Sequence, residues 1–213
     1  MKIFADGGSG RVATATIRIL AGQGHAVYAG SRHPDTIVKG DNIFPQALDL
    51  HGAVDALAEQ VAGMDAVYFL AGSRGKDLLQ TDAFGCVKLM QACERAGVKR
   101  YIQLSSIYSL QPEKWQGEPS LASIVNYDIA RFFADQWLIR NTALDYTIVG
   151  PSVLTEAPAA GKIEVNPEHG TTNPIADVAA VLAGVLDRPN TFGKVIYMTG
   201  GDTPIDEALD AVK

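Results

Sequence analysis

The chain has 213 residues, of which 47% are hydrophobic and 20% are charged, and its formal net charge is −6. This length supports one well-buried core, and the acidic balance argues against nucleic-acid binding, which needs a basic face. The longest apolar stretch (178–186) is far shorter than the ~18 to 20 residues of a membrane span. The first predicted strand begins at Lys2, which leaves no room for a signal peptide. We therefore expect a cytoplasmic protein with neither a membrane nor a nucleic acid as partner.

Short apolar runs alternate with segments of helical periodicity along the chain. The predicted strands are 2–6, 25–32, 43–50, 65–72, 100–106, 145–151 and a late edge strand at 194–200. The predicted helices are 11–24, 51–64, 78–97 and 126–141. The strands are nearly continuous in Val, Ile, Leu and Tyr, as expected when helices cover both faces of a sheet. This alternation predicts an α/β fold with a Rossmann-type, doubly wound parallel sheet in a single domain (1–213). Within it, residues 151–175 are expected to form a small, loop-rich cap on the substrate side.

A glycine cluster, "GGSG" (7–10), lies between the first predicted strand and the first helix. Gly7 can form a tight turn, and Gly10 lets the backbone approach a pyrophosphate closely. The helix that follows offers free N–H groups and the positive end of its dipole. Ala13 stands where a dinucleotide fingerprint often has its last glycine, and a small residue suffices there for helix–strand packing. A simple flexible turn is the alternative, but the position after a strand and before a helix favours a pyrophosphate site.

The end of the second predicted strand bears on the choice of cofactor. Sites that prefer NAD place an acid there for the ribose 2′-hydroxyl. Here the strand ends with Ser31 and Arg32, and no acid follows until Asp35. Arg11, within the glycine loop, could supply a second cation. Because guanidinium binds phosphate bidentately, this pattern predicts NADP(H) in preference to NAD(H). The alternative for Arg32 is a solvated charge at a strand end.

Two later strand ends fit the same ligand. Asp49 could accept a hydrogen bond from the adenine amino group, and Leu50 could pack on the ring. The small residues at 71–73 leave room for a ribose. All these positions follow the carboxyl ends of successive strands, where nucleotides bind in parallel sheets.

Several segments spread over nearly the whole chain carry motifs of one family: the glycine loop, "LAG" (70–72), "LSS" (104–106), Tyr127-x-x-x-Arg131 and "LDYTIVGPSVLT" (144–155). Together they resemble the short-chain dehydrogenase/reductase superfamily. "GVKRYIQLSS" (97–106) and "IADVAAVL" (175–182) are most similar to its atypical branch, which is NmrA-like or NAD(P)-dependent epimerase/dehydratase-like. That branch includes reductases, epimerases and non-catalytic redox sensors.

The resemblance implies a catalytic set of Tyr127 as proton donor, Ser106 as the group that polarises the substrate oxygen, and Arg131 in place of the family's Lys. Residues four apart share a helix face, so Tyr127 and Arg131 can both face the nicotinamide ribose. A cation beside the phenol would lower the pKa of Tyr127 toward neutrality. Arg keeps the charge but cannot release a proton. The alternative is that Tyr127 only begins a helix that packs on the core.

The resemblance also places Ser105 beside this set and residues 151–153 in a loop over the nicotinamide. The predicted cofactor-binding residues are Gly7, Gly8, Ser9, Gly10, Arg11, Val12, Ser31, Arg32, Asp49, Leu50, Ala71, Gly72, Ser73, Ser105, Pro151, Ser152 and Val153. No metal site is expected, because the four histidines show no ligand spacing.

Three functions remain open at this point. The first is an NADP(H)-dependent oxidoreductase that acts on an unidentified small carbonyl metabolite. The second is a non-catalytic NADP(H) sensor, and the third is a sugar-nucleotide epimerase or dehydratase. A homodimer or a protein partner stays possible in each case. Cys86 and Cys93 are expected to be reduced and buried, and Trp115 to be either a pocket wall, part of a partner surface or an anchor for its loop.

Overall fold

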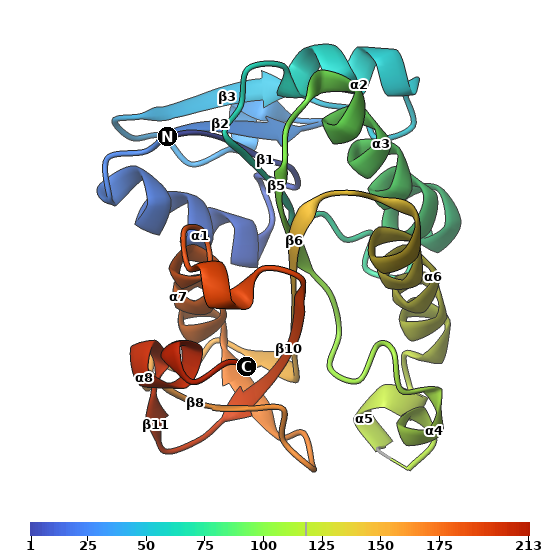
Figure 1. Ribbon diagram of the computed structural model, residues 1–213, viewed down its shortest axis with the longest axis vertical. Helices are drawn as coiled ribbons and strands as arrows, with labels where there is room; N and C mark the ends of the chain where they lie inside the picture. The colour runs from blue at the N-terminus through green and yellow to red at the C-terminus, as the bar shows by residue number, and fades with distance from the viewer. Residues whose placement is uncertain (118) are drawn as a thin grey trace.

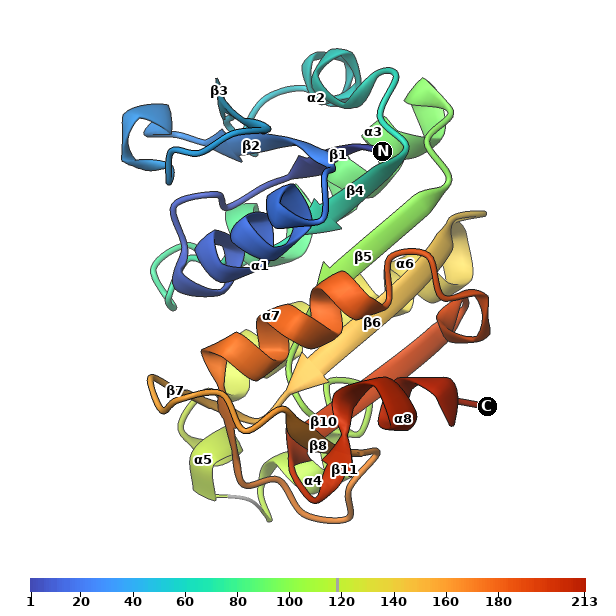
Figure 2. The ribbon, with the colours of Figure 1, turned by 90° about the vertical axis from the view of Figure 1, so that its left-hand side faces the viewer.

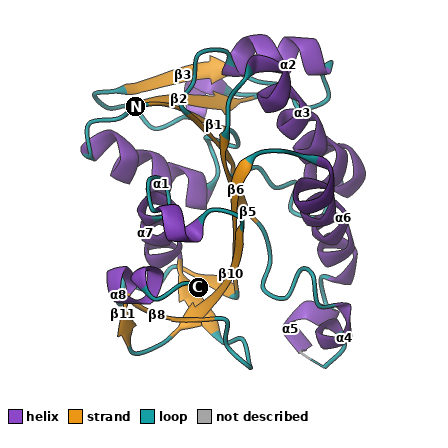
Figure 3. Ribbon diagram, viewed as in Figure 1, coloured by secondary structure: helices purple, strands orange, loops and turns teal. Residues whose placement is uncertain are grey.

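The structure is a computed structural model that describes residues 1–117 and 119–213. Within these residues, a nine-stranded sheet runs through the middle of the molecule between two layers of helices (Figure 1; Figure 3). Its strands follow the order β11-β8-β10-β6-β5-β4-β1-β2-β3. Neighbours from β3 to β10 pair in parallel, whereas β8 runs antiparallel to both β10 and β11. The strand bounds are β1 Lys2–Ala5, β2 Ala26–Ser31, β3 Ile43–Ala47, β4 Ala66–Phe69, β5 Arg100–Leu104, β6 Asp145–Pro151, β8 Lys162–Val165, β10 Lys194–Gly200 and β11 Thr203–Pro204.

The predicted fold class is confirmed, and β6 and β10 have the predicted bounds. The prediction that 194–200 is an edge strand is wrong. Residues Lys162–Val165, in a segment that its Pro and Gly residues marked as loop, form β8 on the outer side of β10. The expected loop-rich cap also contributes a second small sheet, in which β7 (Val153–Thr155) pairs with β9 (Thr172–Pro174).

Helices cover both faces of the large sheet. On one face lie α1 (Arg11–Gly22), α7 (Ile175–Gly184) and α8 (Ile205–Asp210), which face the viewer in Figure 2. On the other lie α2 (Val54–Val61), α3 (Cys86–Ala96) and α6 (Val125–Asn141). Each layer buries its own apolar cluster against the sheet. None of the described helices is long and apolar enough to cross a membrane.

Short elements occupy the connections. They are η1 (Pro34–Thr36), η2 (Leu78–Gly85), α4 (Pro112–Trp115), α5 (Pro119–Ala122) and η3 (Pro189–Thr191). The helix predicted at 78–97 is divided, because its first part is the π-helix η2 and only Cys86–Ala96 is α-helical. At the junction, a Cβ on Gly85 would lie 2.8 Å from the carbonyl oxygen of Gln80. The wider turn therefore leaves space only for glycine.

Predictions from the sequence concern the side chains of Cys86, Cys93 and Trp115, and the structure shows where each of them lies. Cys86 and Cys93 are free and fully buried, as predicted. Trp115 is buried, and its Nε1 donates a hydrogen bond to the carbonyl oxygen of Tyr108 at 2.9 Å. Its ring meets the edge of Phe132 at 6.0 Å between centroids. Trp115 thus anchors its segment to Tyr108 and to α6.

The strand order positions a ligand site. From β1 the chain continues outward through β2 to β3, and it then crosses to β4 on the other side of β1. In open parallel sheets, ligands bind beyond the carboxyl ends of the strands where the order reverses in this way. The loops after β1 and β4 flank that point.

Candidate functional site

The glycine loop closes tightly between β1 and α1. Gly7 has a φ of +61°, and a Cβ there would lie 2.7 Å from the backbone of Ala71. The N–H of Gly10 returns to the carbonyl oxygen of Gly7 at 2.7 Å. Gly10 is also the N-cap of α1, which has no side-chain cap and no acidic residue in its first turn. The first N–H groups of α1 therefore remain free for an anion, and Ala13 is buried in the core, as a packing position requires.

Asp6, at the end of β1, ties the glycine loop to β4. Its buried carboxylate accepts hydrogen bonds from the N–H groups of Leu70 and Ala71, the latter at 2.8 Å. Burial raises the pKa of Asp6 to about 7, although these two N–H groups and the charge of Arg131 oppose the rise. Asp6 fixes the spacing between the two loops at the point where the strand order reverses.

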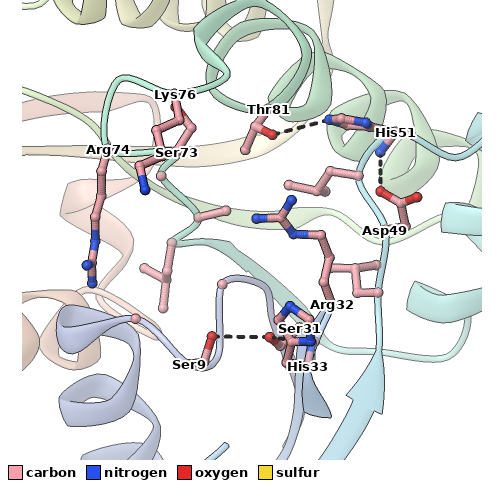
Figure 4. Close-up of a pocket in the computed structure, with 18 residues that line it drawn as sticks. Ser9, Ser31, Arg32, His33, Asp49, His51, Ser73, Arg74, Lys76 and Thr81 are labelled. Atoms are coloured by element: carbon pink, nitrogen blue, oxygen red, sulfur yellow. Dashed lines mark hydrogen bonds between the residues drawn. The ribbon is translucent and has the colours of Figure 1, made fainter. Parts of the chain in front are cut away.

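A first cavity of about 320 Å³ opens beyond the carboxyl ends of β1, β2, β3 and β4 (Figure 4). Ten of the predicted cofactor residues line it: Gly7, Ser9, Gly10, Ser31, Arg32, Asp49, Leu50, Ala71, Gly72 and Ser73. Gly7 and Gly10 bring the backbone to the wall of this cavity, and Gly10 is also the N-cap of α1. These features fit a dinucleotide phosphate.

Arg32 extends from the end of β2 into this cavity, and His33 lies beside it (Figure 4). Arg32 is exposed and has no hydrogen-bond or ion-pair partner among the described residues. Next to it, the hydroxyls of Ser9 and Ser31 are 3.1 Å apart, and Ser31 Oγ also accepts from the N–H of His33 at 3.1 Å. The end of β2 thus gathers donors, and none of the residues 31–33 is an acid.

A polar cluster lies on the wall of the first cavity that the turn after β3 and η2 form. Asp49 Oδ1 accepts from the N–H of His51 at 2.9 Å, and His51 Nε2 lies 2.7 Å from Asp77 Oδ2. Thr81 donates to the same Asp77 oxygen at 2.6 Å. The hydrogen bonds from Thr81 and His51 lower the pKa of Asp77. This cluster holds η2 and the turn after β3 in place around the cavity.

A second cavity of about 810 Å³ lies beside the first, at the ends of β5 and β6 and the start of α6. Seven predicted residues line it: Arg11, Ser105, Ser106, Tyr127, Pro151, Ser152 and Val153. Arg11 therefore lies away from Arg32, and its side chain pairs with Glu156 at 2.6 Å. The loop expected at 151–153 is instead the end of β6 and the start of β7. Gly150 precedes Pro151, the last residue of β6, and a Cβ on Gly150 would lie 2.6 Å from the carbonyl oxygen of Ser106. No larger residue fits at that position.

Tyr127 is half-buried at the edge of the second cavity. Burial raises its pKa to about 12, and the charge of Arg131 only partly opposes this. The expectation of a pKa near neutrality is therefore not met, because desolvation of the phenolate outweighs the nearby cation. At neutral pH the phenol keeps its proton, as a general acid must.

Arg131 is fully buried beneath the site and does not line either cavity. Its guanidinium donates to the carbonyl oxygens of Leu104 at 2.8 Å and Asp82 at 3.1 Å, and its Nε lies 3.5 Å from Ser105 Oγ. Asp135, one turn later, lies 3.7 Å away and accepts from Ser105 Oγ at 2.6 Å. Arg131 thus holds the carboxyl end of β5, which Ser105 and Ser106 follow.

Comparison with known proteins agrees with this geometry. Residues 7–189 match the protein family described as NAD(P)H-binding. The chain belongs to this NAD(P)H-binding family. It is 29% identical to a Bacillus subtilis protein named uncharacterized sugar epimerase YhfK, over 98% of this chain and 99% of that one.

This chain is also similar to proteins whose structures have been solved. The oxidoreductase ylbE from Lactococcus lactis is 42% identical, with a TM-score of 0.96 over 100% of this chain and 96% of that one. A short-chain dehydrogenase/reductase from Veillonella parvula, solved in complex with NADP, has a TM-score of 0.74 over 96% and 97% of the two chains. At 16% identity, that likeness concerns the fold alone.

Within this NAD(P)H-binding chain, three predicted residues line neither cavity: Gly8, Val12 and Arg131. Sequence reasoning missed five polar residues that do line the first cavity: His33, His51, Arg74, Lys76 and Thr81. For the first four, a position close to a predicted strand end was the available signal. His33 directly follows Arg32, and Arg74 directly follows Ser73.

Proposed function

We propose that the protein is an oxidoreductase that uses NADP(H) to reduce a small carbonyl compound. The observation that carries the cofactor choice is Arg32 in the first cavity, which has no partner among the residues that the structure describes and follows a strand end without an acid. An adenosine 2′-phosphate is a dianion, and it suits this guanidinium with Ser31, Ser9 and His33 around it. Sites for a ribose 2′-hydroxyl place a carboxylate acceptor there, and residues 31–33 include no Asp or Glu.

The second cavity supports the assignment of reduction. NADPH, when bound, supplies a hydride for the carbonyl carbon. The protonated Tyr127 phenol would donate its proton to the carbonyl oxygen, while the Ser106 hydroxyl donates a hydrogen bond to the same atom. Arg131 acts through Ser105, whose hydroxyl it holds together with Asp135, and through its charge, which stabilises the phenolate left on Tyr127.

Removal of the phenol hydroxyl tests this mechanism. In Tyr127→Phe, NADPH oxidation with a panel of aldehydes and 9,10-phenanthrenequinone should fall by about 10²-fold or more, while the Kd for NADP⁺ stays unchanged. The matched control is Tyr28→Phe, since Tyr28 lies outside both cavities. Unchanged turnover in Tyr127→Phe would show that another group donates the proton.

A non-catalytic NADP(H) sensor is the second candidate, and Arg131 is the observation in its favour. A guanidinium cannot pass a proton to Tyr127, and this one is sealed under the site. The sensor proposal predicts NADP(H) binding without turnover of any carbonyl in the panel. Turnover of nucleotide sugars without net NADPH oxidation would instead favour an epimerase, the activity for which the Bacillus subtilis relative is named.

A further inference from the structure

The walls of the second cavity combine apolar surface with positive charge. Leucine, isoleucine and valine side chains form much of the lining, including Leu78, Ile107 and Leu121. Arg11 and Arg74 are its charged residues, and no Asp or Glu occurs among the described residues that line it. A neutral apolar substrate would not need the two guanidiniums.

Arg74 borders both cavities and is held in an unusual backbone conformation. Its φ is +55°, in the left-handed region that non-glycine residues seldom adopt, and Gly75 follows with a φ of +79°. The side chain is exposed and has no hydrogen-bond or ion-pair partner in the described part of the chain. In Figure 4 it lies on the wall opposite Asp49 and His51. Strained backbone of this kind persists mainly at functional sites.

Arg11 is held only loosely by its partner. It meets Glu156 at 2.6 Å, but the two side chains are 56% and 70% exposed. Exposed ion pairs of this kind add at most ~1 kcal/mol to stability. An anion inside the second cavity can therefore take the place of Glu156 at Arg11.

The cofactor does not need these two arginines for charge balance. Its pyrophosphate would meet the glycine loop and the free N–H groups of α1, and its 2′-phosphate would meet Arg32 at the far end of the first cavity. Arg11 lies instead along the cavity that contains Tyr127 and Ser106, and Arg74 borders that cavity as well as the first.

We propose that the second cavity accepts an apolar carbonyl compound that carries a carboxylate. Arg74 and Arg11 bind the carboxylate, and the aliphatic walls hold the apolar body with its carbonyl toward Tyr127. This inference rests on the proposed function only for the carbonyl group of the substrate. The recognition of an apolar carboxylate follows from the residues that line the second cavity.

The test uses two probes of nearly equal shape, 2-naphthoate and 2-naphthamide, titrated into NADP⁺-loaded protein by calorimetry. Wild-type protein should bind the carboxylate about tenfold more tightly than the amide. Arg74→Gln should reduce this preference to about twofold or less, and Arg11→Gln should weaken it. Arg18→Gln is the matched control, because Arg18 is exposed on the same helix as Arg11 but outside both cavities, and it should leave the preference unchanged.

Equal affinity for the two probes in wild-type protein, or binding of neither, would overturn the proposal. It would also be overturned if Arg74→Gln weakened NADP⁺ binding and left the preference intact, since the arginine would then serve the pyrophosphate. A parallel comparison of 4-carboxybenzaldehyde with 4-formylbenzamide as substrates separates the two proposals. If the probe preference holds and neither aldehyde is reduced, the reductase assignment fails while the carboxylate site stands.

Discussion

Replacement of Asp6 by Asn tests how the buried carboxylate at the end of β1 affects stability. The amide is nearly isosteric, and its oxygen can accept the same hydrogen bonds from Leu70 and Ala71. The second carboxylate oxygen of Asp6 has no hydrogen-bond partner in the described structure. Asn therefore removes the ionisation of this group and preserves most of its contacts.

The sign of the effect follows from the raised pKa of Asp6. Its ordinary value is 3.8, and in the folded protein it is about 7. Between these two values the unfolded chain has released the proton and the folded protein still holds it. The free energy of unfolding therefore falls as the pH rises through this window, and the difference in pKa corresponds to roughly 4 kcal/mol. The stabilising contribution is complete below pH 3.8 and lost above pH 7.

Urea unfolding of the wild type and Asp6→Asn from pH 4 to pH 8 measures this effect. We expect the variant to gain stability relative to the wild type as the pH rises, by up to roughly 4 kcal/mol across the range. Asp202→Asn, at an exposed position, is the control that removes a carboxylate from solvent. Parallel pH profiles for wild type and Asp6→Asn would refute the reasoning, because Asp6 would then ionise alike in both states.

Two further predictions concern the loop and the buried arginine. Gly7→Ala should destabilise the protein by about 1–3 kcal/mol in urea unfolding and weaken NADP⁺ binding, because its Cβ would meet Ala71 at 2.7 Å. Gly63→Ala, equally left-handed but with open space around it, should lose less stability and keep the cofactor affinity; equal effects at both sites would contradict the role of close approach. Arg131→Lys introduces the residue that the resemblance to short-chain dehydrogenases implies here. Lys cannot reach all the acceptors of the guanidinium, so we expect the free energy of unfolding to fall by about 2–4 kcal/mol. Arg140→Lys, at an exposed position, should change the free energy of unfolding little. An equally small change in Arg131→Lys would show that the buried hydrogen bonds of Arg131 do not stabilise the protein.

Much of the fold could be predicted because local pattern and global arrangement agree in this chain. Continuous apolar strands separated by helices imply a parallel sheet, and the glycine loop implies its first crossover. The late strands were less predictable. Lys162–Val165 is short and lies among Pro and Gly residues, and it becomes a strand only because β10 offers it an edge.

The candidate site also contains residues that the sequence could place and others that it could not. Residues that directly follow a strand, such as Arg32 and Asp49, could be placed from sequence because parallel strands end at one edge. The direction of the Arg131 side chain depends on partners far away in sequence, namely the carbonyl oxygens of Asp82 and Leu104. Asp135, four residues later on the same helix, was the local signal that this arginine has a buried partner.

The central claim, that Arg32 selects NADP(H), is tested most directly by calorimetric Kd values for NADP⁺ and NAD⁺ on wild type, Arg32→Ala and the control Arg18→Ala. We predict that wild type and Arg18→Ala bind NADP⁺ at least about tenfold more tightly than NAD⁺. Arg32→Ala should lower the affinity for NADP⁺ to that for NAD⁺ and leave the affinity for NAD⁺ nearly unchanged. Equal affinities for the two cofactors in wild-type protein would contradict the account.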